Sequence, residues 1–105
     1  MQFTSINPYT SDQFAEYPVH SDIQVGNRLR IADKAFTDWS RWSFADRADC
    51  FRRLADVLRT KQPELARLIT GEMGKTLAES RAEIDKCAGQ CLYYADHAEE
   101  MLRPG

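Results

Sequence analysis

Two short stretches of the chain carry residue types that could do chemistry. The first, residues 71–76, reads Gly-Glu-Met-Gly-Lys-Thr and ends like a phosphate-binding P-loop. A P-loop needs four residues between its first glycine and the Gly-Lys-Thr, because that length lets backbone N–H groups wrap a phosphate. Here only Glu72 and Met73 intervene, and Ile69 occupies the position where the first glycine is needed. The stretch therefore does not predict a nucleotide site.

The second stretch, residues 87–91, reads Cys-Ala-Gly-Gln-Cys and offers a thiol nucleophile. A cysteine acts as a nucleophile when a nearby base activates it. This segment lies inside a long helical pattern, and Cys87 and Cys91 fall one turn apart on its apolar stripe. We interpret both as buried structural thiols. With Cys50 the count of cysteines is odd and no secretory signal precedes them, which indicates reduced thiols.

The remaining titratable residues predict no metal site and no acid–base pair. Zinc would need more ligands at turn-like spacing, and the only histidines, His20 and His97, are far apart in sequence. His97 stands among acidic residues and is expected to be solvated. The carboxylates of residues 79–85 belong to a charged outer face with Arg81 and Lys86. The pattern alone thus assigns no catalytic residue, no cofactor-binding residue and no metal ligand.

The composition is that of an ordinary soluble globular protein. The 105 residues are 43% hydrophobic and 29% charged, with 14 basic and 16 acidic side chains and a net charge of −2. No basic run marks a nucleic-acid binder, and no apolar run approaches the ~20 residues of a membrane helix. The first residues lack the basic and apolar regions of a signal peptide. We expect a cytoplasmic protein that binds neither nucleic acid nor membrane.

The elements that must position these residues are predicted to be mainly helical. Residues 1–20 contain two short apolar stretches around a turn-rich segment, which predicts a β-hairpin. Residues 21–105 predict about four helices, which together form a single incomplete domain. The first two are expected after the capping residues Ser21 and Ser43. Pro63 suits the first position of a third helix and Gly74 its end, while Thr76 and Glu79 open a fourth that runs to about Arg103.

The order of these segments resembles the N-terminal part of the aldehyde dehydrogenase superfamily. The resemblance rests on Ile6-Asn7-Pro8-x-Thr10 in the hairpin, Ala35-Phe36-x-x-Trp39, and the segments RADCFRRLADVL (47–58), ELARLITGEMGKTLAESRAEI (64–84) and CLYYADHAEEML (91–102). The sequences of the last two segments are most similar to those of bacterial NAD(P)-dependent succinate-semialdehyde dehydrogenases. Ser11 stands where the family usually has glycine, and this departure is expected to alter the hairpin turn.

The resemblance implies an activity that we do not expect this chain to have by itself. Family members oxidise aldehydes to acids with NAD or NADP, through a cysteine thiolate on a loop after Gly-Gln-x. Here Cys91 follows Gly89-Gln90 directly, on a helix, so its role is not carried over. The Rossmann core and the catalytic glutamate are also absent, and we expect no bound cofactor. One face of the family's matching long helix lines the aldehyde tunnel, which implies this role for Lys86, Gln90 and Tyr93.

Two functional hypotheses remain open at the level of sequence, as does the choice between NAD and NADP. The first is the N-terminal portion of a succinate-semialdehyde-type aldehyde dehydrogenase that is inactive alone. The alternative is a free-standing helical interaction or oligomerisation module without enzymatic activity. Because the sheet that these helices cover in the family is not encoded, we also expect a homo-oligomer. Its contact is predicted on the apolar face of the fourth helix, at Ile84, Cys91, Tyr94 and Ala98.

Overall fold

The computed structural model describes residues 1–105 and begins with an antiparallel hairpin. Its strands are β1 (Gln2–Ile6) and β2 (Gln13–Pro18), and Phe3 pairs with Tyr17 across them. In the turn, the Asn7 Oδ1 accepts hydrogen bonds from the backbone N–H groups of Tyr9 and Thr10, at 2.9 and 3.3 Å. A side chain that bonds to the backbone in this way favours a tight turn over a longer strand. The predicted hairpin is confirmed.

Ser11 is the only residue other than glycine with a positive φ, at +66°. Its backbone N–H donates to the carbonyl oxygen of Asn7 at 2.8 Å, which closes the turn. An L-residue pays about 1–2 kcal/mol for the left-handed conformation, whereas glycine adopts it freely. The turn therefore requires the conformation that suits glycine, and Ser11 adopts it at a cost.

Four helices follow, as the sequence predicts: α1 (Asp22–Trp39), α2 (Phe44–Thr60), α3 (Gln62–Met73) and α4 (Leu77–Met101). The hydroxyls of Ser21, Ser43 and Thr76 each accept a hydrogen bond from the backbone three residues later, so all three predicted caps are present. Gly74 ends α3 with φ at +75°. The boundaries differ slightly from the prediction, because α3 begins one residue before Pro63 and α4 ends at Met101.

The hairpin packs on the end of α3, and this contact explains the two glycines of the P-loop-like stretch. Gly71 is buried, and a Cβ at this position would overlap the Phe14 ring. A Cβ on Gly74 would lie 2.8 Å from the Pro8 ring. Both glycines therefore let the hairpin approach the helix closely. Lys75 follows them and forms an ion pair with Glu83 at 4.0 Å.

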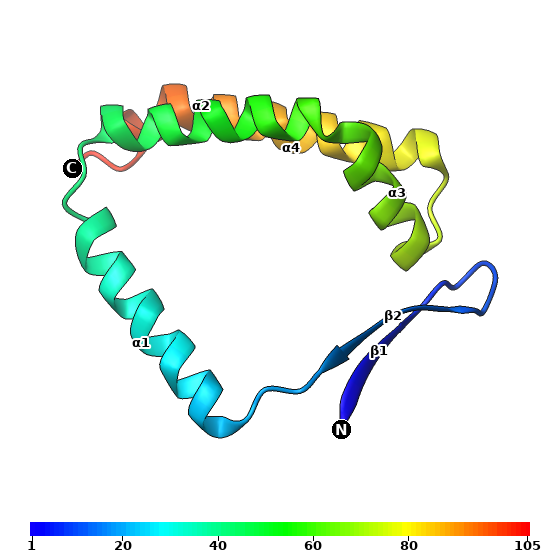
Figure 1. The fold of residues 1–105 in the computed structure, drawn as a ribbon. Helices are drawn as coiled ribbons and strands as arrows, with labels where there is room; N and C mark the ends of the chain where they lie inside the picture. Colours follow the sequence, from blue (N-terminus) through cyan, green and yellow to red (C-terminus); the bar gives the residue numbers. More distant parts are fainter.

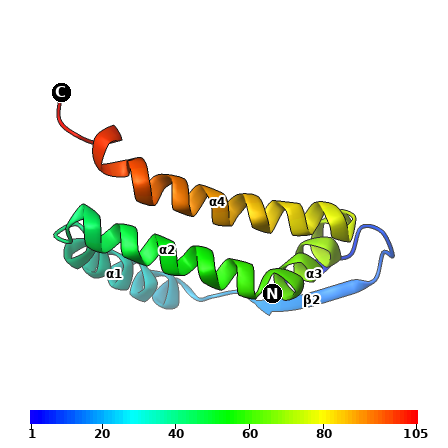
Figure 2. The same ribbon diagram turned by 90° about the horizontal axis from the view of Figure 1, so that it is seen from above.

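Helices α2 and α4 lie side by side and form the small core together with α3 (Figure 2). Most of its buried residues are small, which lets the helix backbones come close: Ala55, Ala66, Gly71, Ser80, Ile84 and Ala88. The Ser80 hydroxyl is satisfied by the Thr70 hydroxyl at 2.8 Å. Ile84 is only 7% exposed, so the prediction that it lies at an uncovered contact is wrong.

The whole chain forms an open ring (Figure 1). Helix α1 begins on the side of the hairpin and runs toward the α2–α4 layer, which the chain enters after Trp39, and α1 has no buried residue. The radius of gyration is 17.9 Å, whereas a compact domain of this length has about 13 Å. Only 6 of the 105 residues are buried. None of the helices combines the length and apolarity that crossing a membrane requires.

Candidate functional site

The three cysteines are free thiols at half-buried positions. Cys87 and Cys91 lie on α4, as expected, but both are less covered than the predicted buried thiols, because α2 and α3 cover only part of their helix. The Cys50 sulfur accepts a hydrogen bond from Arg53 at 3.1 Å. His97 is exposed, and its ring lies 4.5 Å from that of Tyr93. No three His, Cys, Asp or Glu side chains come close enough to hold a metal ion.

The three residues predicted to line an aldehyde tunnel lie together on one exposed side of α4. Lys86, Gln90 and Tyr93 follow helical spacing, and each is exposed. Lys86 takes part in none of the ion pairs of the molecule. Tyr93 packs edge-to-face against Tyr94, with ring centroids 5.4 Å apart. This face is therefore a polar surface with one cation outside any ion pair, and no other element of the chain covers it.

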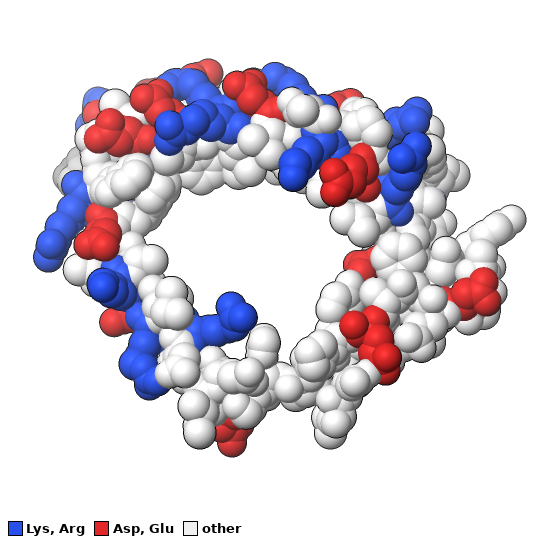
Figure 3. Space-filling model, in the orientation of Figure 1, with Lys and Arg blue, Asp and Glu red and all other residues white.

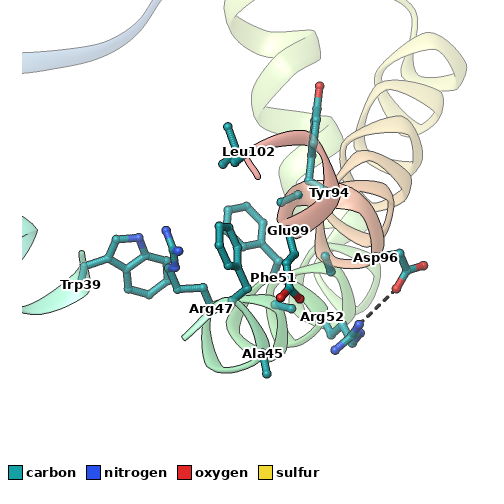
Figure 4. Close-up of a pocket in the computed structure, with 13 residues that line it drawn as sticks. Trp39, Ala45, Arg47, Phe51, Arg52, Tyr94, Asp96, Glu99 and Leu102 are labelled. Carbon is teal, nitrogen blue, oxygen red and sulfur yellow. Dashed lines mark hydrogen bonds and ion pairs between the residues drawn. The ribbon is translucent and has the colours of Figure 1, made fainter. Parts of the chain in front are cut away.

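An open groove of about 590 Å³ lies between the start of α2 and the end of α4 (Figure 4). Its size is within the range of ligand pockets in proteins. Aromatic and aliphatic side chains from three elements form most of its walls: Trp39, Phe44, Phe51, Tyr94 and Leu102. Four charged residues also reach it: Arg47, Arg52, Asp96 and Glu99. The sequence analysis did not predict this groove.

Arg47 stands between Trp39 and Phe51 in the groove (Figure 4). Its guanidinium lies 4.5 Å above the Phe44 ring centroid, a cation–π contact that holds the side chain in place. The Nε–H of Arg47 is buried and has no hydrogen-bond acceptor. A buried donor left without an acceptor costs about 1–3 kcal/mol, and more when the group is charged. The groove thus contains a fixed donor that lacks its partner.

Arg52, by contrast, is fully engaged at the edge of the groove. It donates to Asp96 and Asp49, each at 3.1 Å, and so ties α2 to α4. The hydrogen bond to Asp96, with a smaller contribution from Asp49, raises the pKa of the Arg52 guanidinium above its usual range. Because both carboxylates are exposed, this ion pair fixes the position of the helices but adds little free energy.

Comparison with known proteins places this arrangement in a family. The sequence profile of the aldehyde dehydrogenase family matches residues 1–104. The chain belongs to the aldehyde dehydrogenase family. A probable succinate-semialdehyde dehydrogenase [NADP(+)] of Synechocystis is 38% identical over 102 residues, which are 97% of this chain and 22% of that protein. This aldehyde dehydrogenase segment therefore spans about a fifth of the length of that relative.

Solved structures of longer chains contain the same arrangement of elements. The structure of Gox0499, described for its cofactor and substrate selection, superposes with a TM-score of 0.91 at 34% identity. The match covers 99% of this chain and 23% of that one. A succinic semialdehyde dehydrogenase from Streptococcus pyogenes, in complex with NADP+, gives 0.87 at 28% identity over 96% of this chain and 22% of its own. The open ring is therefore found within much longer polypeptides.

Proposed function

We propose that this chain is the N-terminal part of an NAD(P)-dependent aldehyde dehydrogenase that oxidises succinate semialdehyde. The observation that carries the proposal is the 38% identity, over 97% of the chain, to a relative named for this activity. The names of that relative and of the Streptococcus pyogenes structure both include NADP+, which supports a nicotinamide cofactor for the complete enzyme. In this proposal the segment is a scaffold, since its own residues form no nucleophile–base arrangement.

We further propose that the 105 residues alone do not oxidise aldehydes. Cys91, the one cysteine that follows Gly-Gln, lies within the regular helix α4 and is half-buried. The thiolate is the nucleophilic form of cysteine, so the side chain needs a base or a positive environment to attack a carbonyl. His97 packs against Tyr93, with ring centroids 4.5 Å apart, and no hydrogen bond joins it to the Cys91 sulfur. Nothing in the segment therefore activates Cys91.

The exposed face of α4 is proposed to contribute to the substrate path. Succinate semialdehyde carries a carboxylate at the end opposite its aldehyde, and this carboxylate needs a cation or hydrogen-bond donors. Lys86 supplies a cation that no carboxylate of the segment neutralises. Gln90 and Tyr93 add an amide and a hydroxyl on the same side. The remainder of the enzyme would close the path from the other side.

A chimera tests the proposed function. The segment of the Synechocystis relative that matches this chain is replaced by this chain, and reduction of NADP by succinate semialdehyde is followed by absorbance. We expect turnover by the chimera and none by the isolated chain. Two controls are the intact relative and the relative without the segment.

Either of two results contradicts the proposal. A folded chimera that binds NADP+ but oxidises no aldehyde would show that this segment does not serve a dehydrogenase, and it would favour the alternative, a helical interaction module. Turnover by the isolated chain that disappears in Cys91→Ala would show instead that Cys91 is an active nucleophile.

A further inference from the structure

The groove between the start of α2 and the end of α4 is not used by the proposed function. Tyr94 and Ala98 line it from α4, whereas Lys86, Gln90 and Tyr93 form the exposed side that is assigned to the substrate path. Consecutive residues of an α-helix point about 100° apart, so Tyr94 belongs to a different side of α4 from Tyr93. A molecule in the groove would therefore be bound separately from the aldehyde.

Arg47 brings to this groove a cation that has no anionic partner in the chain. Side-chain hydrogen bonds are donated by Arg30, Arg52 and Arg53, but not by Arg47. None of the ion pairs includes Arg47 either. Its Nε–H is buried without an acceptor, whereas its terminal Nη groups are not enclosed in this way. The Nη groups are therefore the donors that a molecule in the groove can reach.

The guanidinium of Arg47 is held in position before anything binds to it. It lies 4.5 Å from the centroid of the Phe44 ring, and the side chain stands between Trp39 and Phe51 (Figure 4). A side chain that is fixed in this way loses little conformational entropy on binding. The planar guanidinium matches the two oxygens of a carboxylate, to which it can donate two parallel hydrogen bonds. A carboxylate is therefore the group that Arg47 suits.

The other charged residues of the groove limit this ligand to a single negative charge. Asp96 is neutralised by Arg52, which donates to it at 3.1 Å. Glu99 also lines the groove and belongs to no ion pair, so its charge remains. A second negative charge on the ligand would be repelled by Glu99 and would find no second free cation. A monoanion is therefore favoured over a dianion such as phosphate.

The outer side of the α2–α4 layer carries charges of both signs. On the face drawn in Figure 3, lysine and arginine side chains alternate with carboxylates along this layer, and no large patch of one sign forms there. The net charge of the whole chain is −2. An anion therefore gains little from the long-range field of this surface, and its binding depends on a fixed local cation.

The walls of the groove determine the rest of the ligand. The groove has a volume of about 590 Å³, within the range of ligand pockets, and its walls are mostly aromatic and aliphatic. Such walls gain free energy when an apolar group covers them. We infer that the groove binds a monocarboxylate with an apolar chain or ring, whose carboxylate lies on the Nη groups of Arg47. This site goes beyond the proposed function and does not depend on it.

Octanoate is the probe for this site, and two molecules with the same chain but another head group are its controls. Titration calorimetry measures the binding of octanoate, octanol and octylammonium to the 105-residue chain, at a concentration where sedimentation shows a monomer. We expect octanoate to bind ~10-fold or more tightly than octanol, because it adds a hydrogen bond between two charged groups. Octylammonium should bind no more tightly than octanol.

Three variants separate Arg47 from a general effect of charge. Arg47→Met keeps an apolar stem but loses every donor, so octanoate should bind ~10-fold or more weakly and octanol as before. Glu99→Gln removes the like charge of the groove and should tighten octanoate binding by roughly 2- to 5-fold. Arg53→Met removes an exposed arginine of the same helix outside the groove and should change neither constant. Circular dichroism verifies that each variant is folded.

Three results would overturn the inference. Equal binding of octanoate and octanol by the wild type would show a groove that takes any apolar molecule and selects no anion. An Arg47→Met variant that is folded and binds octanoate as the wild type does would show that the carboxylate lies elsewhere. A chain that remains associated at the lowest concentration measured, and binds none of the three probes, would show that a second copy occupies the groove.

Discussion

Lys86 is the residue that the proposed function assigns to binding of the substrate carboxylate. It is an exposed cation on α4, and the carboxylate of succinate semialdehyde would be its partner. A hydrogen bond to a charged group contributes about 1.5–3 kcal/mol, so Lys86→Met in the chimera should raise the KM for succinate semialdehyde by ~10-fold. The KM for butanal, which has no carboxylate, should not change. Steady-state kinetics with the two aldehydes measure this difference.

The matched control for Lys86 is Lys34→Met, which removes an exposed lysine of α1. An equal rise in KM for both aldehydes would mean that Lys86 supports the fold or the tunnel walls and does not bind the carboxylate. The sequence placed Lys86 on one face with Gln90 and Tyr93, since helical spacing alone decides which residues share a face, and in the structure all three are exposed. It did not identify Arg47, because the missing acceptor of the Nε–H becomes visible only when Phe44, Trp39 and Phe51 are assembled around it.

The contact between the hairpin and α3 depends on the absence of a side chain at Gly71. Gly71→Ala would bring the new methyl group into the Phe14 ring, so the ring must be displaced from its contact with the helix. Overpacking of this kind typically costs about 1–3 kcal/mol. We expect a lower Tm and faster amide hydrogen exchange in β1 and β2, as measured by calorimetry and by exchange with mass spectrometry.

Gly89 provides the control for this substitution within the same small protein. It is also a helical glycine, but a Cβ there meets no atom within 4 Å. Gly89→Ala should therefore raise stability by about 0.5–1 kcal/mol through the better helix propensity of alanine. A Gly71→Ala variant that is stabilised to the same degree would mean that the hairpin does not dock on α3 in solution.

At the level of elements, the sequence predicted most of what local chemistry decides. The hairpin turn, the caps at Ser21, Ser43 and Thr76, and the end of α3 at Gly74 each depend on residues within a few positions of one another. The error at Ile84 has a different origin. Which apolar residues of α4 are covered depends on where α2 and α3 lie, and no pattern within α4 contains that information.

At the level of the whole molecule, the sequence did not predict the ring. The caps and apolar faces that the sequence predicts are local features, and they do not determine how the four helices are arranged around one another. The structure instead holds α1 away from the other helices, with its apolar residues uncovered. The groove is missed for the same reason, since its two sides come from residues about 50 positions apart at the start of α2 and the end of α4.

The predicted homo-oligomer can now be restated as a proposal for the chain in isolation. Its uncovered apolar residues should associate with those of other copies, since exposed patches larger than several hundred Å² are rare on monomers. Because a two-fold contact must pair one patch with itself and the inner side of an open ring is concave, we expect a mixture of species that grows with concentration, not one closed dimer. Sedimentation velocity over a range of micromolar concentrations measures this distribution.

Phe51→Glu tests whether the groove takes part in this self-association. It places a charge at the wall of the groove, where Phe51 is 37% exposed, and burying that charge against a second copy is unfavourable. We expect the association constant to fall by ~10-fold or more, because an unpaired buried charge costs at least as much as a lost charged hydrogen bond. Ala78→Glu adds the same charge at an exposed position of α4 outside the groove and should associate like the wild type. A wild-type chain that stays monomeric and fully helical at every concentration would show instead that the open ring is self-sufficient in water.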